Sequence, residues 1–175
     1  PPALLDTLAG MAFKSAAGGG LSATMAEKPR IEGCFAFNGG DFADAGQAAI
    51  ELKARLAALG VPAQTVRRAA VSAFEAEMNV IIHARAGSMY YVIRGGELLI
   101  TVTDTGPGIA DVELAMQEGY STAPKWARDV GWGSGMGLPN IKNNSDALKI
   151  DSIVGEGTTL LITIKLGAEG QNENC

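Results

Sequence analysis

The sequence predicts an α+β protein with one domain, built as a two-layer α/β sandwich with helices on one face of a mixed, largely antiparallel sheet. Three observations support this expectation. The 175-residue chain has the length of one domain with tails. Its 47% hydrophobic and 19% charged residues suffice for a packed core. The expected elements follow the order β-α-α-β-β-α-α-β-β, which lacks the alternation of parallel βαβ units.

Domain boundaries follow from where regular patterns begin and end. Residues 1–30 begin with Pro1-Pro2 and lack a sustained amphipathic period, so we expect a leader or linker that is partly disordered. Residues 31–166 are expected to form the folded domain, and residues 167–175 a polar tail.

The first half of this domain predicts one strand and two helices. The strand covers residues 31 to 37, and Asp41 is expected to cap the helix that follows. A second helix is expected from Pro62 to about residue 84. The first helix should end at Gly60, and its apolar stripe repeats at three- and four-residue steps: Phe42, Ala45, Ala49, Leu52, Leu56 and Leu59.

The second half predicts four strands and two helices. Gly95-Gly96 is typical of a tight hairpin, and the final strand alternates apolar and more polar residues, so one of its faces should be buried. In chain order we expect strands over residues 88–94 and 97–103, a short helix near 111–118, a helix from near 138, and strands over 148–154 and 158–166.

The second helix carries a polar stripe beside its apolar face. Glu75, Asn79 and His83 follow at four-residue steps and therefore lie on one side of the helix. An amide oxygen suits Mg²⁺, and a nearby carboxylate can take a proton from an attacking hydroxyl. By itself, such a spacing is also common on solvated helix faces.

An acidic residue ends the strand before the glycine-rich segment. Asp104 is followed by Thr-Gly-Pro-Gly-Ile, so that backbone can approach a flat ligand closely at the sheet edge. Its carboxylate would accept from the exocyclic amine of adenine, whereas guanine presents a carbonyl there. An ordinary turn is the alternative for this segment alone.

Alternating glycines precede the last helix, in the run from Gly131 to Gly137. Backbone N–H groups of such a run can converge on an anion, for which phosphate is the obvious candidate, and the helix N-terminus adds partial positive charge. The spacing matches neither a P-loop nor a dinucleotide fingerprint. A flexible hinge is the alternative.

Taken in order, these motifs and Gly155-Glu-Gly-Thr-Thr159 in the final hairpin resemble the four ATP-site motifs of the GHKL superfamily, over about residues 31–166. Asp104-Thr-Gly-Pro-Gly-Ile, Glu118-Gly-Tyr-Ser-Thr122 and Gly135-Met-Gly-Leu-Pro-Asn-Ile-Lys142 are most similar to bacterial partner-switching serine/threonine kinases and anti-sigma factors. The resemblance implies a Bergerat-type ATP-binding fold with ATP and Mg²⁺ as cofactors.

The resemblance also implies roles for single residues. Glu75 matches the catalytic general base, Asn79 the Mg²⁺ ligand, and Asp104 the adenine acceptor. Residues 110 to 132 correspond to the ATP lid, in which Lys125 and Arg128 could neutralise phosphate. The remaining expected nucleotide-binding residues lie within the quoted motifs: Gly106, Gly108, Ile109, Gly133, Ser134, Gly135, Met136, Gly137, Leu138 and Thr158.

From this resemblance we expect an ATP- and Mg²⁺-dependent serine/threonine protein kinase that phosphorylates a small antagonist or scaffold protein, with a sigma factor or effector as a further partner. A nucleotide-dependent anti-sigma or effector-binding module without kinase activity is the alternative, and the catalytic domain of a sensor histidine kinase is a third reading. By analogy a homodimer is plausible. The net charge of −5 argues against nucleic acid as a partner. No membrane partner is expected, and the location is expected to be cytoplasmic.

Three features remain open at this stage. Glu77 falls in the apolar arc of its helix, which predicts a less buried helix there in preference to a second site carboxylate. Trp126 and Trp132 flank the lid and either contact a partner or pack internally. His83 is expected near the mouth of the site, not as a phosphoacceptor.

Overall fold

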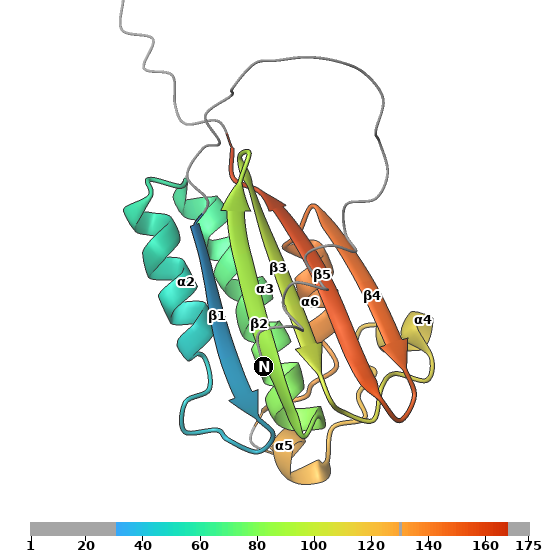
Figure 1. Ribbon diagram of the computed structural model, residues 1–175. Helices are drawn as coiled ribbons and strands as arrows, with labels where there is room; N and C mark the ends of the chain where they lie inside the picture. Colours follow the sequence, from blue (N-terminus) through green and yellow to red (C-terminus); the bar gives the residue numbers. More distant parts are fainter. Residues whose placement is uncertain (1–30, 130, 168–175) are drawn as a thin grey trace, which may run out of the picture.

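The computed structural model describes residues 31–129 and 131–167. The expected leader 1–30 and nearly all of the tail 167–175 lie outside the described residues, so these boundaries stay predictions. The described residues form a five-stranded sheet with the order β1-β2-β3-β5-β4. Helices α2, α3 and α6 lie together against one face of that sheet, which gives the expected two layers (Figure 1).

The strands follow the sequence pattern closely. They are β1 (Ile31–Asn38), β2 (Ala86–Arg94), β3 (Glu97–Asp104), β4 (Ala147–Ile153) and β5 (Gly157–Lys165). Within the described ranges all four strand pairings are antiparallel, so the sheet contains no parallel pair there. Gly95 and Gly96 both have positive φ angles, 58° and 80°, as the predicted tight hairpin requires.

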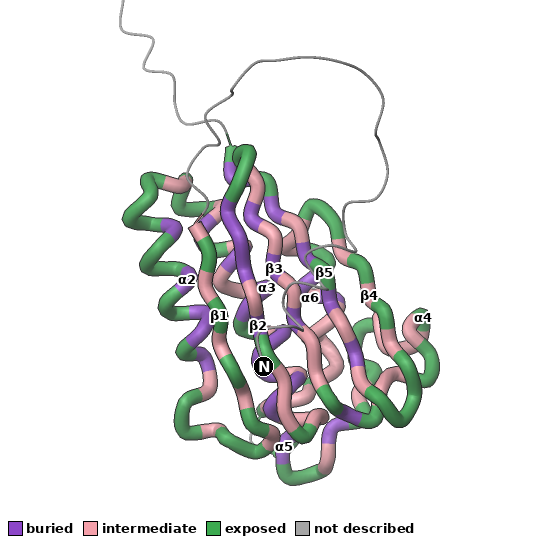
Figure 2. The backbone as a smooth tube through the Cα atoms, viewed as in Figure 1, coloured by how far each residue is buried: buried purple, intermediate pink, exposed green. Residues whose placement is uncertain are grey.

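Two long helices cover the sheet. Helix α2 (Gln47–Ala58) buries Leu52 and Leu56, and α3 (Ala63–His83) places alanines and Val80 against the same core. Along β5 the buried positions Leu160, Ile162 and Ile164 alternate with more exposed ones, as the sequence predicts (Figure 2). The core therefore lies between one sheet face and these helices.

The first helix begins later than expected. Asp41 does not cap it, because α2 starts at Gln47 and the residue before it, Gly46, has a φ of 92°. Phe42 and Ala45, expected on the helical stripe, lie in the connecting loop instead. In that loop Phe42 packs against two tryptophan rings that come from the segment before α6, a contact that the helical stripe did not predict.

In the described residues, three short helices lie between β3 and β4. Helix α4 (Val112–Ala115) is shorter than expected and is capped by Asp111, whose Oδ1 accepts from the N–H of Leu114 at 2.8 Å. Helix α5 (Lys125–Asp129) was not expected. Helix α6 (Gly137–Asn143) begins where the glycine run ends, as predicted.

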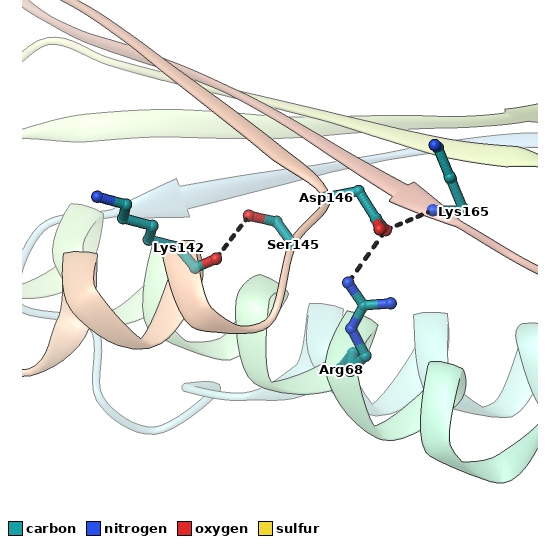
Figure 3. A network of polar contacts seen from close by, with 5 residues as sticks. All are labelled: Arg68, Lys142, Ser145, Asp146 and Lys165. Carbon is teal, nitrogen blue, oxygen red and sulfur yellow. Dashed lines mark hydrogen bonds and ion pairs between the residues drawn. The ribbon is translucent and has the colours of Figure 1, made fainter.

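Asp146 fixes the connection from α6 to β4. Its Oδ2 accepts from Arg68 Nη2 of α3 at 3.0 Å and from the backbone N–H of Lys165 in β5 at 2.8 Å (Figure 3). The bond from the Lys165 N–H is the main cause that lowers the pKa of Asp146. This residue therefore joins both layers at the end of the helix that follows the glycine-rich loop.

Candidate functional site

A cavity of about 650 Å³ opens between α3, the turn after β3, the lid and the glycine-rich loop before α6. Its volume lies within the range of roughly 300–1,000 Å³ that is usual for small-molecule sites. Most of the residues predicted to bind nucleotide or metal line it: Glu75, Asn79, Asp104, Gly108, Ile109, Gly133, Ser134, Gly135, Met136, Gly137, Leu138 and Thr158. The fold thus brings together motifs that are far apart in the sequence.

Three predicted residues do not line the cavity. Gly106 is buried beside it, where an added Cβ would lie 2.8 Å from Asp104 Oδ1. Lys125 and Arg128 are exposed on α5, because this helix turns Ala127 toward the interior. Gly106 therefore supports the shape of the Asp104 turn, and the geometry gives no support to the phosphate contacts predicted for Lys125 and Arg128.

The polar stripe of α3 faces the cavity as its spacing predicts. Glu75, Asn79 and His83 all line it. Burial lowers the pKa of His83, so the neutral imidazole is favoured. The neutral ring is a hydrogen-bonding group at the cavity wall, consistent with its expected place near the site.

Helix α6 lies close to the middle of α3. A Cβ added to Gly137 would lie 2.9 Å from Asn79 Oδ1, so any larger residue there would displace the Asn79 amide from its present position. One turn further along α6, Asn140 Nδ2 donates to Glu75 Oε1 at 2.7 Å. The sequence gives no signal for this role of Asn140, because a linear motif does not show which side chain of α6 meets α3.

Asp104 stands at the end of β3 with its carboxyl group partly desolvated. Burial raises the pKa of Asp104, and the backbone N–H groups of Thr158 and Gly106 oppose that rise by donating to its carboxylate. The site thus offers an acceptor held by two backbone donors at the end of the central strand β3, which suits a ligand that donates from an amine.

The turn after Asp104 is tied to the final hairpin. Gly108 has a φ of 69°, and a Cβ there would lie 2.3 Å from the carbonyl oxygen of Ile153. Ser152 Oγ accepts from the N–H of Ile109 at 2.8 Å and lies 2.9 Å from Thr158 Oγ1. The sequence did not predict a part for Ser152 in the site, because the residue pattern shows only that it occupies an inward-facing position on a strand.

The glycine-rich loop packs against the lid. A Cβ added to Gly133 would lie 2.3 Å from the Cβ of Ala123, and one added to Gly135 would lie 2.4 Å from the carbonyl carbon of Gly119. The N–H of Gly119 donates to the carbonyl oxygen of Gly135 at 3.0 Å. The sequence predicts glycine in this loop because it exposes N–H groups to an anion. The structure adds a second reason, since the lid approaches these glycines too closely for a side chain.

Both tryptophans pack on Phe42. The ring of Phe42 stacks on Trp132 with centroids 4.7 Å apart and meets Trp126 edge to face at 5.2 Å. Trp126 nevertheless keeps 49% of its surface exposed. The structure thus shows that both rings pack on Phe42, which joins the lid to the loop between β1 and α2, and the exposed face of Trp126 leaves the partner reading untested for that residue.

The expectation for Glu77 is wrong. We expected a less buried helix at this position, but Glu77 is only 1% exposed. Its Oε1 accepts from the N–H of Gly46 at 2.8 Å, so it serves the start of α2 and does not line the cavity. A linear pattern could not show this, because the helix end that Glu77 meets comes from another part of the chain.

An α+β sandwich whose cavity gathers a carboxylate, an amide and a glycine-rich loop defines a nucleotide-binding class of protein. Residues 65–168 match the family described as "Histidine kinase-, DNA gyrase B-, and HSP90-like ATPase", so the chain belongs to the HATPase_c family. This confirms the resemblance to the GHKL superfamily, and membership of an ATPase family implies that the domain binds ATP.

Named relatives fall in the expected subgroup. The chain is 38% identical to an anti-sigma F factor of Pasteuria penetrans over 101 residues, which cover 54% of this chain and 64% of that protein. It is 32% identical to the serine/threonine-protein kinase RsbT of Bacillus subtilis over 102 residues, which cover 55% of this chain and 71% of that protein. The chain thus spans less than two thirds of the anti-sigma F factor that it matches.

A solved histidine kinase domain, from the blue-light activated histidine kinase of Erythrobacter litoralis EL346, overlaps 70% of this chain and 61% of its own. The TM-score is 0.43 at 19% identity, which is too weak to support an inference about function.

Within the described ranges, no helix is both long enough and apolar enough to cross a membrane.

Proposed function

We propose that the chain is an ATP- and Mg²⁺-dependent serine/threonine protein kinase that phosphorylates a small antagonist protein in a partner-switching system. The observation that carries this proposal is the placement of Glu75 and Asn79, one helical turn apart, in the cavity that Asp104 and the glycine-rich loop also line. The kinase RsbT among the relatives supports the same activity.

Each part of the cavity has a task in this proposal. Asp104 accepts from the adenine amine, and Thr158 supplies a hydroxyl beside it. N–H groups of the loop from Gly133 to Gly137 contact the phosphates. Lys125 and Arg128, which lie outside the cavity lining, are proposed only as further phosphate contacts.

The donor set suits Mg²⁺ bound together with a nucleotide. Mg²⁺ at nucleotide sites is typically held by one or two protein oxygens, with phosphate oxygens and water as the other ligands. Asn79 offers such an oxygen next to Gly137, where a Cβ would fill the space. The ion would supply charge neutralisation for the transferring phosphoryl group.

Glu75 is the proposed general base. It accepts the proton of the attacking serine or threonine hydroxyl while the loop N–H groups stabilise charge on the phosphoryl oxygens. Because phosphoryl transfer depends mostly on positioning and electrostatics, the protein's contribution lies in holding these groups in place.

The test is transfer of label. The chain is incubated with Mg²⁺ and ATP labelled at the γ-phosphate, together with the protein that co-purifies with it from its source cells. We expect label on a serine or threonine of that protein, located by mass spectrometry. Bound ATP and bound partner without any label would contradict the proposal.

That contrary result would favour a second candidate, a nucleotide-dependent anti-sigma or effector-binding module without kinase activity. The anti-sigma F factors among the relatives are the observation in its favour. In that case ATP would act only to order the lid, and partner affinity would depend on nucleotide although no phosphate moved.

A further inference from the structure

The hydrogen bond between Asn140 and Glu75 connects α6 to the middle of α3. Asn140 is the fourth residue of α6, one turn beyond the glycine-rich loop, and its Nδ2 lies 2.7 Å from Glu75 Oε1. Both side chains line the cavity. This is a short distance for an N–H donor and an oxygen, as expected when the acceptor is a carboxylate.

The orientation of the Asn140 amide is set by its partner. A carboxylate only accepts hydrogen bonds, so the Nδ2 end of the amide must face Glu75. The opposite orientation would bring two oxygens together and repel them. The hydrogen-bonding capacity of the two groups therefore fixes the direction of this bond.

The backbone of Asn140 is held independently of Glu75. Its N–H donates to the carbonyl oxygen of Met136 at 2.8 Å, and its carbonyl oxygen accepts from Asn144 Nδ2 at 2.9 Å. Its neighbours Pro139 and Ile141 are buried. The amide donor thus starts from a fixed point, whereas Glu75 has several rotatable bonds.

We propose that Asn140 is a positioning residue that holds the Glu75 carboxylate in the orientation needed to accept a hydroxyl proton. The donor occupies Oε1, which leaves Oε2 for the attacking hydroxyl. Because Asn140 lies on the helix that follows the glycine-rich loop, the base keeps its place relative to the proposed phosphate contacts. The inference rests on the proposed kinase function and adds a residue that acts through Glu75.

The test separates phosphoryl transfer from ATP binding and from folding. Asn140→Leu removes the donor with little change in size, and Asn140→Asp places a second carboxylate against Glu75. We expect both variants to bind ATP within about twofold of wild type by calorimetry, while transfer to the partner slows by about 10- to 100-fold, the scale of a misplaced reacting group. The same substitutions at Asn143, exposed on the same helix, are the matched controls and should leave transfer unchanged.

Exchanging the amide and the carboxylate between positions 140 and 75 tests their contact by thermal stability, without an activity assay. We expect Asn140→Asp to lower the melting temperature by about 2–4 °C, the size of shift that 1 kcal/mol produces in a domain of this length. The double variant Glu75→Gln with Asn140→Asp restores an amide facing a carboxylate and should regain the lost stability, while transfer falls further because glutamine cannot accept the proton.

Each outcome decides the inference. Transfer by Asn140→Leu at the wild-type rate, or loss of ATP affinity in step with transfer, overturns it while the kinase proposal stands. If the single variants do not fold, the exchange variant decides, because failure to recover stability means that the pair is not in contact. Absence of transfer by the wild-type chain overturns the kinase proposal and, with it, this inference.

Discussion

Glu77 accepts a hydrogen bond from the backbone N–H of Gly46 at 2.8 Å, although the two residues lie 31 positions apart in the chain. The N–H groups of Gln47, Ala48 and Ala49 also lower the pKa of this carboxyl group. A buried acid of α3 therefore does for α2 what a capping side chain of its own loop would otherwise do, since the first turn of a helix has N–H groups without partners inside the helix.

This relationship predicts how stability responds at position 77. Glu77→Ala removes an acceptor from buried N–H groups and should lower the free energy of unfolding by about 1–3 kcal/mol. Glu77→Gln keeps an acceptor oxygen and should cost less. Urea unfolding monitored by circular dichroism measures both, and equal losses in the two variants would contradict a capping role.

The same residue predicts a pH dependence. Burial is the largest effect on Glu77 and raises its pKa, so the folded state holds the proton more tightly than the unfolded chain does. The stability this provides is fully present below the ordinary glutamate pKa and is lost as the pH rises through the raised folded value. Unfolding free energies of wild type and Glu77→Gln across that range should diverge, with the flatter profile for the variant.

Glu75→Ala should retain ATP binding and lose phosphoryl transfer. A positioned general base contributes about 10²–10⁴-fold, so we expect a loss of that size in the labelled-ATP assay. Glu51→Ala is a suitable control, because Glu51 is exposed, does not line the cavity and pairs with Arg55 one turn away on α2. A fully active Glu75→Ala variant would remove Glu75 from the mechanism.

Asp104→Asn should weaken ATP binding. The substitution can turn a donor amide toward the adenine amine in place of the acceptor, and we expect the Kd to rise about 10- to 100-fold, or roughly 1.4–3 kcal/mol. Titration calorimetry with Mg²⁺ present measures this directly. An unchanged Kd would show that adenine does not bind at Asp104.

Phe42→Ala should release the lid from the loop between β1 and α2, because both tryptophan contacts are lost. Amide hydrogen exchange across residues 120 to 133 should then become faster, by about tenfold for each 1.4 kcal/mol of lost packing. Leu59→Ala, an exposed position at the far end of α2, is the control. Unchanged exchange in the variant would mean that the lid is held by other contacts.

Much of this architecture was predictable because it depends on local periodicity. The spacing of apolar residues on the two long helices, the double glycine at 95 and 96 and the alternation along β5 each predict the element that is found. The gathering of Glu75, Asn79 and Asp104 in one cavity followed from the order of the motifs and not from the spacing within any of them.

The errors have a common physical origin in contacts between distant segments. Phe42 lies outside the expected helix and packs on the lid, and the buried Glu77 meets the start of α2. The role of Asn140 depends on how α6 crosses α3. None of these contacts could be predicted from a single stretch of sequence, because the partner group comes from a distant segment of the chain.

The aromatic contacts of Phe42 have a practical consequence for kinetic work. The chain contains two tryptophans, and both lie against this one ring at the lid. The natural fluorescence of the unlabelled protein, excited at the red edge of the indole band, therefore reports on the lid. Stopped-flow mixing with nucleotide can therefore test in real time whether the surroundings of the lid change, without a dye and without altering a residue of the cavity.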